Sequence, residues 1–347
     1  MNVVDKARAS AASFIAVIAC LTVAVSLAAA HVNADRPDGT IAYSSGEIWL
    51  VDADASGKSK RLTRTSDNYA PVVWSADGRW VAFERHYDGP QRDCCVEVRI
   101  VRADGRATVK LTPRGAEDAD PDWSPTAPRI AFARRYGYGA IGVYVADADG
   151  SRVRRIMDNA DSPAWSPDGR RIAYSSRGRT GIYVMNADGT GSRLVRRGAH
   201  SAVSWSPNGR MLLFSAVNAR GSATQAWVVN VDGSGLRRVT KQCADVSYPA
   251  WSPDGRRIAF ACIRTRPQTN VHDIYTANFN GTGLRQLTTN PRSDTHPAWS
   301  PDGQWIAYVG YAGEYDNGVW VMRSDGTKRQ RLTSYTHDSA PSWRPGT

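Results

Sequence analysis

The stretch from Tyr248 to Phe260 reads YPAWSPDGRRIAF. Its tryptophan belongs to a motif that returns along the chain at intervals of 40 to 49 residues. The seven motif tryptophans are Trp74, Trp123, Trp165, Trp205, Trp251, Trp299 and Trp343. A motif that recurs at such a period indicates a repeat architecture, in which each copy is one supersecondary unit.

Each repeat carries the signals of four short strands. The segment Pro-x-Trp-Ser leads into a Pro-Asp-Gly turn and then into a short strand such as Ile258 to Phe260. A loop of variable length, a β-branched run and a second Asp-Gly or Asn-Gly turn follow, and the unit ends in Leu-Thr, as at Leu287-Thr288. Asp-Gly between β-branched and aromatic runs is a strong hairpin signal. We therefore expect one four-stranded antiparallel sheet per repeat.

The second strand of the repeat predicts how the sheets pack. Side chains alternate along a strand, so Ile258 and Phe260 lie on one face and Ala259 on the other. A bulky face against a small face allows neighbouring sheets to nest around a common axis, which makes a β-propeller. The motif tryptophans are then core residues that determine the fold.

Counting strands predicts the number of blades. The Ile-Ala-Phe strand occurs seven times, and the chain enters its first unit late, at Ile41. A first strand without a unit of its own remains at the other end, from Ala340 to Pro345. Pairing these two ends would close the ring and remove its free edges. The expected fold is all-β: a seven-bladed, monomeric β-propeller of four-stranded antiparallel blades over residues 39–347, closed by its N- and C-terminal strands.

The N-terminal segment differs from the repeats. Lys6 and Arg8 precede an apolar run from Ala11 to Ala30, with small residues before His31. This pattern predicts a secretory signal peptide over residues 1–30 and a linker over residues 31–38. An uncleaved membrane anchor is the alternative, because about 20 apolar residues can cross a bilayer. Export predicts a periplasmic or secreted protein.

Cysteine placement agrees with export. Cys243 precedes the first strand of one repeat and Cys262 follows its second strand, so the hairpin brings them together and we expect a disulfide. Cys94 and Cys95 lie in another repeat and either pair with each other or stay reduced. No C-x-x-C spacing points to zinc.

Loop length varies on only one face of the expected ring. The turns between strands 1 and 2 and between strands 3 and 4 share one face, here the turn face. The links between strands 2 and 3 and between blades share the other, the loop face. The long segments Glu84 to Glu97, Ser215 to Gln225 and Ala261 to Asp273 belong to the loop face. Variable loops on a rigid scaffold commonly bind partners, so we place the functional surface there.

Acidic and histidine side chains gather before the first strands, toward the expected mouth of the central channel. This candidate binding set is Asp67, Asp118, Asp120, Asp161, His200, Asp245, Asp294, His296, His337 and Asp338. The carboxylates either cap turns or form a site for a cation such as Ca²⁺. The three histidines either lie there by chance or bind a transition metal.

Charge and motif content narrow the function classes. The formal net charge is +11, and loss of residues 1–30 would remove Lys6, Arg8 and Asp5 to leave +10. Arginines such as Arg170 and Arg256 follow the Asp-Gly turns and form a basic rim, either solvated or facing an anionic envelope polymer. Nucleic acid is not expected for an exported protein. No G-x-S-x-G elbow or H-E-x-x-H motif occurs, and no catalytic residue is assigned.

The order P-x-W-S-P-D-G-x-x-I-A-F, I-Y-V-x-x-x-D-G and R-x-L-T resembles the WD40-like (PD40-type) propeller repeat of TolB-related proteins, over Gly39 to Pro345. The resemblance implies a propeller that binds partners in the cell envelope. The repeat also resembles seven-bladed oligogalacturonate lyases, which use channel histidines and a metal. The sequence therefore predicts a non-catalytic binder of protein or glycan, with a metal-dependent polysaccharide lyase acting at the channel mouth as the alternative.

Overall fold

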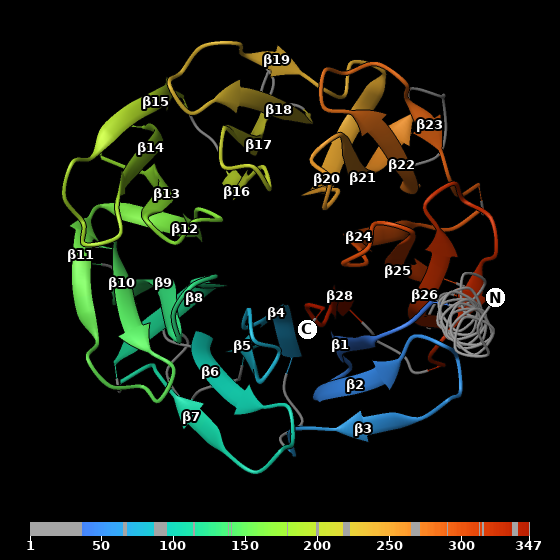
Figure 1. Cartoon of the computed structure of the whole chain (residues 1–347), viewed down its shortest axis with the longest axis horizontal. Helices are drawn as coiled ribbons and strands as arrows, with labels where there is room; N and C mark the ends of the chain where they lie inside the picture. Colours follow the sequence, from blue (N-terminus) through green and yellow to red (C-terminus); the bar gives the residue numbers. More distant parts are fainter. Residues whose placement is uncertain are drawn as a thin grey trace, which may run out of the picture. The chain divides into compact units, whose positions relative to one another are not determined.

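The computed structural model describes residues 37–64, 68–86, 96–113, 115–137, 139, 141–178, 180–198, 201–217, 223–264, 271–289, 291–311, 313, 316–334 and 339–346. Residues Gly39–Thr347 form one compact unit. This unit is a ring of seven four-stranded antiparallel sheets around a central opening (Figure 1). The predicted seven-bladed, all-β fold is confirmed.

Each blade runs from an inner strand at the channel to an outer strand at the rim (Figure 1). From the channel outward, blade 1 contains β28 (Ser339–Trp343), β1 (Thr40–Ser44), β2 (Ile48–Asp52) and β3 (Ser59–Arg61), and blade 2 contains β4 (Asn68–Trp74), β5 (Trp80–His86), β6 (Val96–Arg102) and β7 (Thr108–Lys110). Blade 3 contains β8 (Ala116–Trp123), β9 (Arg129–Tyr136), β10 (Ile141–Asp147) and β11 (Arg154–Asp158), and blade 4 contains β12 (Ala160–Trp165), β13 (Arg171–Ser176), β14 (Gly181–Asn186) and β15 (Arg193–Arg197). Blade 5 contains β16 (Ser201–Trp205), β17 (Met211–Val217), β18 (Thr224–Asn230) and β19 (Arg237–Arg238). Blade 6 contains β20 (Cys243–Trp251), β21 (Arg257–Arg264), β22 (Asp273–Asn278) and β23 (Arg285–Gln286), and blade 7 contains β24 (Asp294–Trp299), β25 (Trp305–Tyr311), β26 (Asn317–Arg323) and β27 (Gln330–Arg331).

The ring closes within blade 1. Its inner strand is the C-terminal β28, which pairs antiparallel with the N-terminal β1, Trp343 opposite Ile41. The predicted closure by the two ends of the chain is therefore confirmed. Among the described residues, no helix is long and apolar enough to cross a membrane.

The core lies between blades. Six of its seven hydrophobic clusters join the alanine of one second strand to the bulky pair of the next blade: Ala173 packs with Leu212 and Phe214, and Ala259 with Ile306 and Tyr308. In the seventh, Leu213 takes the place of the alanine. The alternation of side chains along the strand gives each sheet one bulky and one small face, so the blades nest in one direction around the ring.

The motif tryptophans link the same junctions through hydrogen bonds. Trp205 is 7% exposed, and its Nε1 donates to the carbonyl of Ala164 in the preceding blade at 2.9 Å. Four other indoles do the same: Trp74 to Ser342, Trp123 to Val73, Trp299 to Ala250 and Trp343 to Ala298. Burial of a large aromatic surface and a directed hydrogen bond thus hold five of the seven junctions, whereas the indole N–H groups of Trp165 and Trp251 are buried without a hydrogen-bond partner.

The Pro-Asp-Gly segment is a capped turn. Asp254 accepts hydrogen bonds from the hydroxyl of Ser252 at 2.5 Å and from the backbone N–H of Arg256 at 3.0 Å. The same serine oxygen accepts the N–H of Arg257 at 2.9 Å, and Gly255 adopts φ +67°. This geometry explains why Ser, Asp and Gly recur at fixed spacing.

Candidate functional site

A repeated β-bulge shapes the wall of the central channel. In six blades the residue three positions before the motif tryptophan has a left-handed backbone with φ between 46° and 55°; these residues are Asp120, Ser162, Ala202, Tyr248, His296 and Ala340. The pairing register between the first two strands of the blade shifts at this point, as between Ser247 and Ala250. A bulge redirects the side chain of the extra residue, and left-handed non-glycine residues are concentrated at functional sites.

On one side of the channel the bulge residues line a cavity of about 540 Å³. Asp120, Ser162 and Ala202 come from three neighbouring inner strands and all face this space, together with Pro71 of blade 2. The hydroxyl of Ser162 donates to Asp120 Oδ2 at 3.0 Å. Because these residues occupy equivalent positions of different blades, their side chains converge on the channel at one level.

A buried glutamate supports this side of the channel. Glu84, at the end of β5, is 7% exposed, and its Oε1 accepts the backbone N–H of Asp120 at 2.6 Å. Its Oε2 lies 3.2 Å from His86 Nε2. Burial raises the pKa of Glu84 to about 8, and the neighbouring Asp120 adds to the effect. Glu84 therefore carries a proton at neutral pH and holds the strained backbone of Asp120 without adding a charge.

A second carboxyl with a raised pKa is that of the half-buried Asp122, two residues beyond Asp120 on the inner strand β8. Asp122 Oδ2 accepts the backbone N–H of Trp165 from the next blade at 2.6 Å. Burial raises the pKa of Asp122 to about 7, and that of Asp120 is raised by burial as well. The cavity is thus bordered by carboxyl groups that exchange protons nearer neutral pH than ordinary carboxyls do.

The opposite side of the channel is aromatic. The rings of Tyr248 and His296, from blades 6 and 7, stack with centroids 3.6 Å apart and planes inclined by 27°. Tyr248 is 49% exposed. Burial lowers the pKa of His296 to about 4, so its imidazole is neutral at physiological pH. This pair offers a partly exposed, uncharged platform rather than a cationic site.

The described members of the sequence-derived acidic set do not converge. Asp118 and Asp294 are fully buried. Asp161 accepts a hydrogen bond from Arg177 Nε at 2.5 Å, and Asp245 accepts one from the backbone N–H of Thr224 at 2.7 Å. Only Asp120 of these lines the cavity. The physical reason is that they lie three, four, five or six positions before their tryptophans, and successive side chains of a strand point to opposite faces.

The remaining members of that set, Asp67, His200, His337 and Asp338, lie outside the described residues, as do Cys94 and Cys95 and the central parts of the three long loops. Within the described ranges, no group of three His, Cys, Asp or Glu side chains is placed to hold a metal ion.

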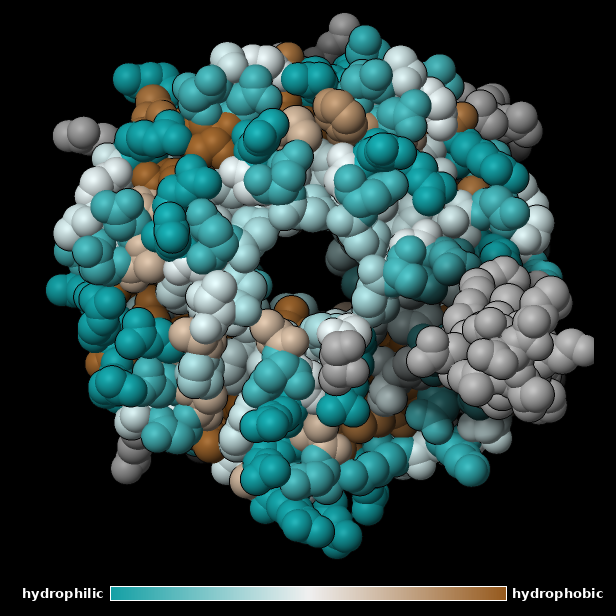
Figure 2. Space-filling model, viewed as in Figure 1, coloured by the Kyte–Doolittle hydropathy of each residue, from teal (hydrophilic) through white to brown (hydrophobic). Residues whose placement is uncertain are grey.

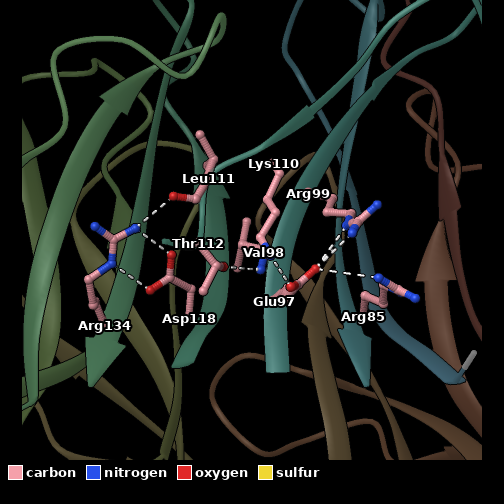
Figure 3. Close-up of polar contacts among 9 residues, drawn as sticks. All are labelled: Arg85, Glu97, Val98, Arg99, Lys110, Leu111, Thr112, Asp118 and Arg134. Atoms are coloured by element: carbon pink, nitrogen blue, oxygen red, sulfur yellow. Dashed lines mark hydrogen bonds and ion pairs between the residues drawn. The ribbon is translucent and has the colours of Figure 1, made fainter. Parts of the chain in front are cut away.

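Asp118 has a structural partner on the next strand of its own blade. Arg134 on β9 donates from Nε to Asp118 Oδ1 at 2.7 Å and from Nη2 to Oδ2 at 2.6 Å (Figure 3). Arg134 Nη2 also donates to the carbonyl of Leu111, in the link from blade 2, at 2.9 Å. The bidentate pair therefore joins the two inner strands of blade 3, and the bond to Leu111 ties this pair to the link from blade 2.

A neighbouring cluster orders the loop-face end of blade 2. The carboxylate of Glu97 accepts from Arg99 at 2.9 Å and from Lys110, and lies 3.6 Å from Arg85 (Figure 3). Burial opposes ionisation, but hydrogen bonds from Lys110 and Arg99 outweigh it and lower the pKa of Glu97. The outer strands β6 and β7 are thus held together by charge as well as by backbone pairing.

The two cysteines of blade 6 are joined. Cys243 and Cys262 form a disulfide with Cα atoms 5.7 Å apart, between β20 and β21. The bond lies beside Val246, which opposes Cys262 in the register of these strands. It therefore ties the first two strands of the blade that carries Tyr248.

Sequence reasoning missed Glu84, Asp122 and Tyr248. The signal for Tyr248 was present, because it occupies the same position before the tryptophan as Asp120 and His296. When the repeats are aligned on the motif tryptophan, the position three residues before it identifies the bulge residues, whereas a search for acidic residues near the strands does not. No local signal marks Glu84, whose partner Asp120 is 36 residues away.

We expect Glu84→Gln to remove a pH dependence of stability. The pKa of Glu84 is raised in the folded protein, so the folded state binds more protons than the unfolded chain between about pH 4.5 and 8. Wild-type stability must therefore fall as pH rises through this window. Relative to the variant, the wild type should lose about 2 kcal/mol of unfolding free energy between pH 6.5 and 8.5. Urea denaturation at a series of pH values measures the difference.

The matched control is His296→Gln. The pKa of His296 is lowered in the folded state, so the contribution of His296 to the stability of the wild type falls as pH drops below about 6.5. The difference in unfolding free energy between the wild type and His296→Gln should not change with pH above pH 7, whereas the difference between the wild type and Glu84→Gln changes steeply there. Parallel stability curves for the wild type and Glu84→Gln would show that Glu84 ionises normally.

Comparison with known proteins places this fold among characterised families. The family model described as the TolB beta propeller domain (PD40) matches residues 40–251 and 142–347. A curated relative, the Tol-Pal system protein TolB of Anaeromyxobacter dehalogenans (strain 2CP-C), is 34% identical over 164 residues, which cover 44% of this chain and 37% of that protein. The matches span less than half of the length of the curated relatives.

Two solved structures show similar architecture. TolB from Acinetobacter baumannii superposes with a TM-score of 0.57 at 17% identity, covering 87% of this chain and 80% of that one. An oligogalacturonate lyase in complex with manganese gives a TM-score of 0.60 at 15% identity, covering 86% and 85%. At these identities the likeness concerns the fold alone.

Proposed function

The chain belongs to the TolB β-propeller family, and from this membership we propose that it is an exported, non-catalytic propeller that binds a protein or glycan partner at its loop face and channel. The curated relatives are named as components of the Tol-Pal system, which supports a place in the cell envelope. The apolar run of residues 11–30 supports export.

One observation carries the proposal. The bulge position is the same in backbone geometry around six blades, yet its side chains differ: Asp120 and Ser162 on one side, Tyr248 and His296 on the other. A purely structural bulge would accept any small residue. A varied set of polar and aromatic side chains on a repeated scaffold is what selective recognition requires.

The proposal predicts that partner binding depends on the channel wall. The full chain would be immobilised and exposed to solubilised envelope protein and glycan of the organism that makes it. The variant Tyr248→Ala/His296→Ala removes the aromatic platform and should weaken capture of the bound partner by about tenfold or more, the scale expected for loss of a buried aromatic anchor. Isothermal titration with the identified partner measures the change.

Arg170→Ala/Arg256→Ala is the matched control, because both arginines follow turns on the opposite face. Equal loss in both variants, or no loss in the channel variant, would contradict recognition at the channel.

The second candidate is a metal-dependent polysaccharide lyase acting at the channel mouth. The manganese-bound lyase has the same architecture, which is the observation that favours it. The described site contributes one histidine, His296, whose lowered pKa keeps it neutral and thus able to ligate a metal. Metal analysis of the purified chain, with His296→Ala alongside, separates the two. A stoichiometric transition metal lost in the variant, together with cleavage of acidic polysaccharide, would replace the binding proposal.

A further inference from the structure

The turn face of blade 3 departs from the repeat. In five other blades the turn after the motif tryptophan holds a capping side chain that accepts both a serine hydroxyl and a backbone N–H; these residues are Asp77, Asp168, Asn208, Asp254 and Asp302. Blade 3 instead reads Ser124-Pro125-Thr126-Ala127-Pro128. It lacks the Asp and Gly of the capped turn, and Ser124 Oγ makes only a 3.5 Å contact with the N–H of Thr126.

A second feature adjoins the first. In two blades the residue that begins the second strand covers the tryptophan of the next blade with a guanidinium: Arg171 lies 4.8 Å from the Trp205 ring, and Arg257 lies 4.8 Å from the Trp299 ring. At the junction of blades 2 and 3 this position is Trp80, which packs in the same cluster as Trp123. Two indoles therefore meet at this junction, as Trp305 and Trp343 do between blades 7 and 1, but only here do they adjoin a turn that lacks the Asp-Gly cap.

The uncapped turn and the indole pair coincide at a cavity of about 410 Å³ on the turn face. Its walls are two segments, residues 75–80 of blade 2 and residues 123–128 of blade 3. The volume lies within the range of small-ligand sites, about 300–1,000 Å³. The turn face, including the central opening, is shown as a surface in Figure 2. We propose that this cavity, here the Trp80 pocket, is a second binding site, one that takes a pyranose ring of an envelope glycan.

The walls fit the two kinds of surface on a sugar. A pyranose presents flat C–H faces that pack on an indole, and hydroxyls at its edge that need hydrogen-bond partners. Trp80 supplies a partly exposed indole, with the Arg102 guanidinium 5.7 Å from its ring centroid. Pro125 and Pro128 continue the apolar wall, and Ser124, Thr126 and Asp77 supply oxygens at the rim.

Charge at the rim favours an acidic sugar over a neutral one. The side chain of Arg79 is 76% exposed at the edge of the pocket, and its Nε lies 3.9 Å from the Asp77 carboxylate. This loose pair leaves Arg79 able to turn toward the carboxylate of a uronic acid. The positive net charge of the chain adds long-range attraction for such a polymer.

The test uses the full chain and two defined probes, the neutral trimer of N-acetylglucosamine and the acidic trimer of galacturonic acid, in isothermal titration. Binding of either trimer, weakened about tenfold or more by Trp80→Arg, is the expected result. Trp80→Arg installs the residue that Arg171 and Arg257 already provide at other junctions, so the fold should tolerate it. Arg79→Ala should weaken the acidic trimer only.

A second variant removes the pocket in another way. Thr126→Asp/Ala127→Gly/Pro128→Arg restores the turn of the other blades and should abolish binding while leaving the melting temperature unchanged or higher. Gln304→Ala changes the residue of blade 7 that occupies the turn position of Arg79, and it should bind the trimers like the wild type. The Trp80 pocket is overturned if neither trimer binds at millimolar concentration, or if Trp80→Arg binds them as tightly as the wild type does. Neither result bears on whether the channel binds a protein.

Discussion

A chain that ends at Ser334 is expected not to form a stable ring. The truncation removes β28, so blade 1 keeps only β1, β2 and β3. Trp343 is 7% exposed and packs in the cluster that contains Ile41. Its loss exposes the long edge of β1 as well as this apolar surface. The cost should be comparable to the whole stability of a domain, about 5–15 kcal/mol.

Thermal denaturation followed by circular dichroism, with limited proteolysis, measures this effect. The control ends after Arg344, which keeps β28 and the hydrogen bond from the Arg344 N–H to the Thr40 carbonyl at 2.8 Å. A synthetic peptide of residues 335–347 added to the truncated chain should restore cooperative unfolding, because it supplies the missing strand. A truncated chain that melts at the wild-type temperature would show that three strands suffice for blade 1.

Arg134→Met is expected to lower the free energy of unfolding by about 3–5 kcal/mol, because it leaves a buried charge without its partner. Asp118 is fully buried, and Arg134 supplies both of its bidentate hydrogen bonds. Loss of the same guanidinium also frees the carbonyl of Leu111. Chemical denaturation at pH 7 measures the change.

The double variant Asp118→Leu/Arg134→Met is the matched control. It removes both charges and should recover most of the loss, since a buried ion pair and a well-packed apolar pair often have similar stability. The single variant should also lose less at acidic pH, where Asp118 takes up a proton. A double variant as unstable as Arg134→Met would mean that the pair acts through shape rather than charge.

The fold could be predicted because its determinants are local and repeated. Trp, Ser, Asp and Gly of the capped turn act within six residues, as the contacts of Ser252 and Asp254 show. Alternation in Ile258-Ala259-Phe260 then dictates how blades nest. Ring closure could be predicted by counting strands, because the C-terminal end of the chain has one first strand too many and the N-terminal repeat lacks its first strand.

The site was harder to predict because it depends on a break in alternation. The bulge at Asp120 or Tyr248 shifts the register of the inner strand, so a period of two assigns the wrong face to residues before it. Asp118 and Asp294 are expected at the channel mouth from their position before the motif tryptophans, whereas both are fully buried. The partners of Glu84 and Asp122 come from neighbouring blades, at sequence distances that no motif encodes.

The five indole hydrogen bonds between blades all run one way around the ring, each from one blade to the blade before it, as from Trp74 to Ser342 and from Trp343 to Ala298. Every junction is thus a head-to-tail interface of the same kind, and the ring exists because the rotation per blade closes. No contact within such a junction depends on the total number of blades. Duplication or deletion of one whole unit would leave every interface chemically intact and change only the angle between neighbours, so blade number can evolve without the invention of a new contact.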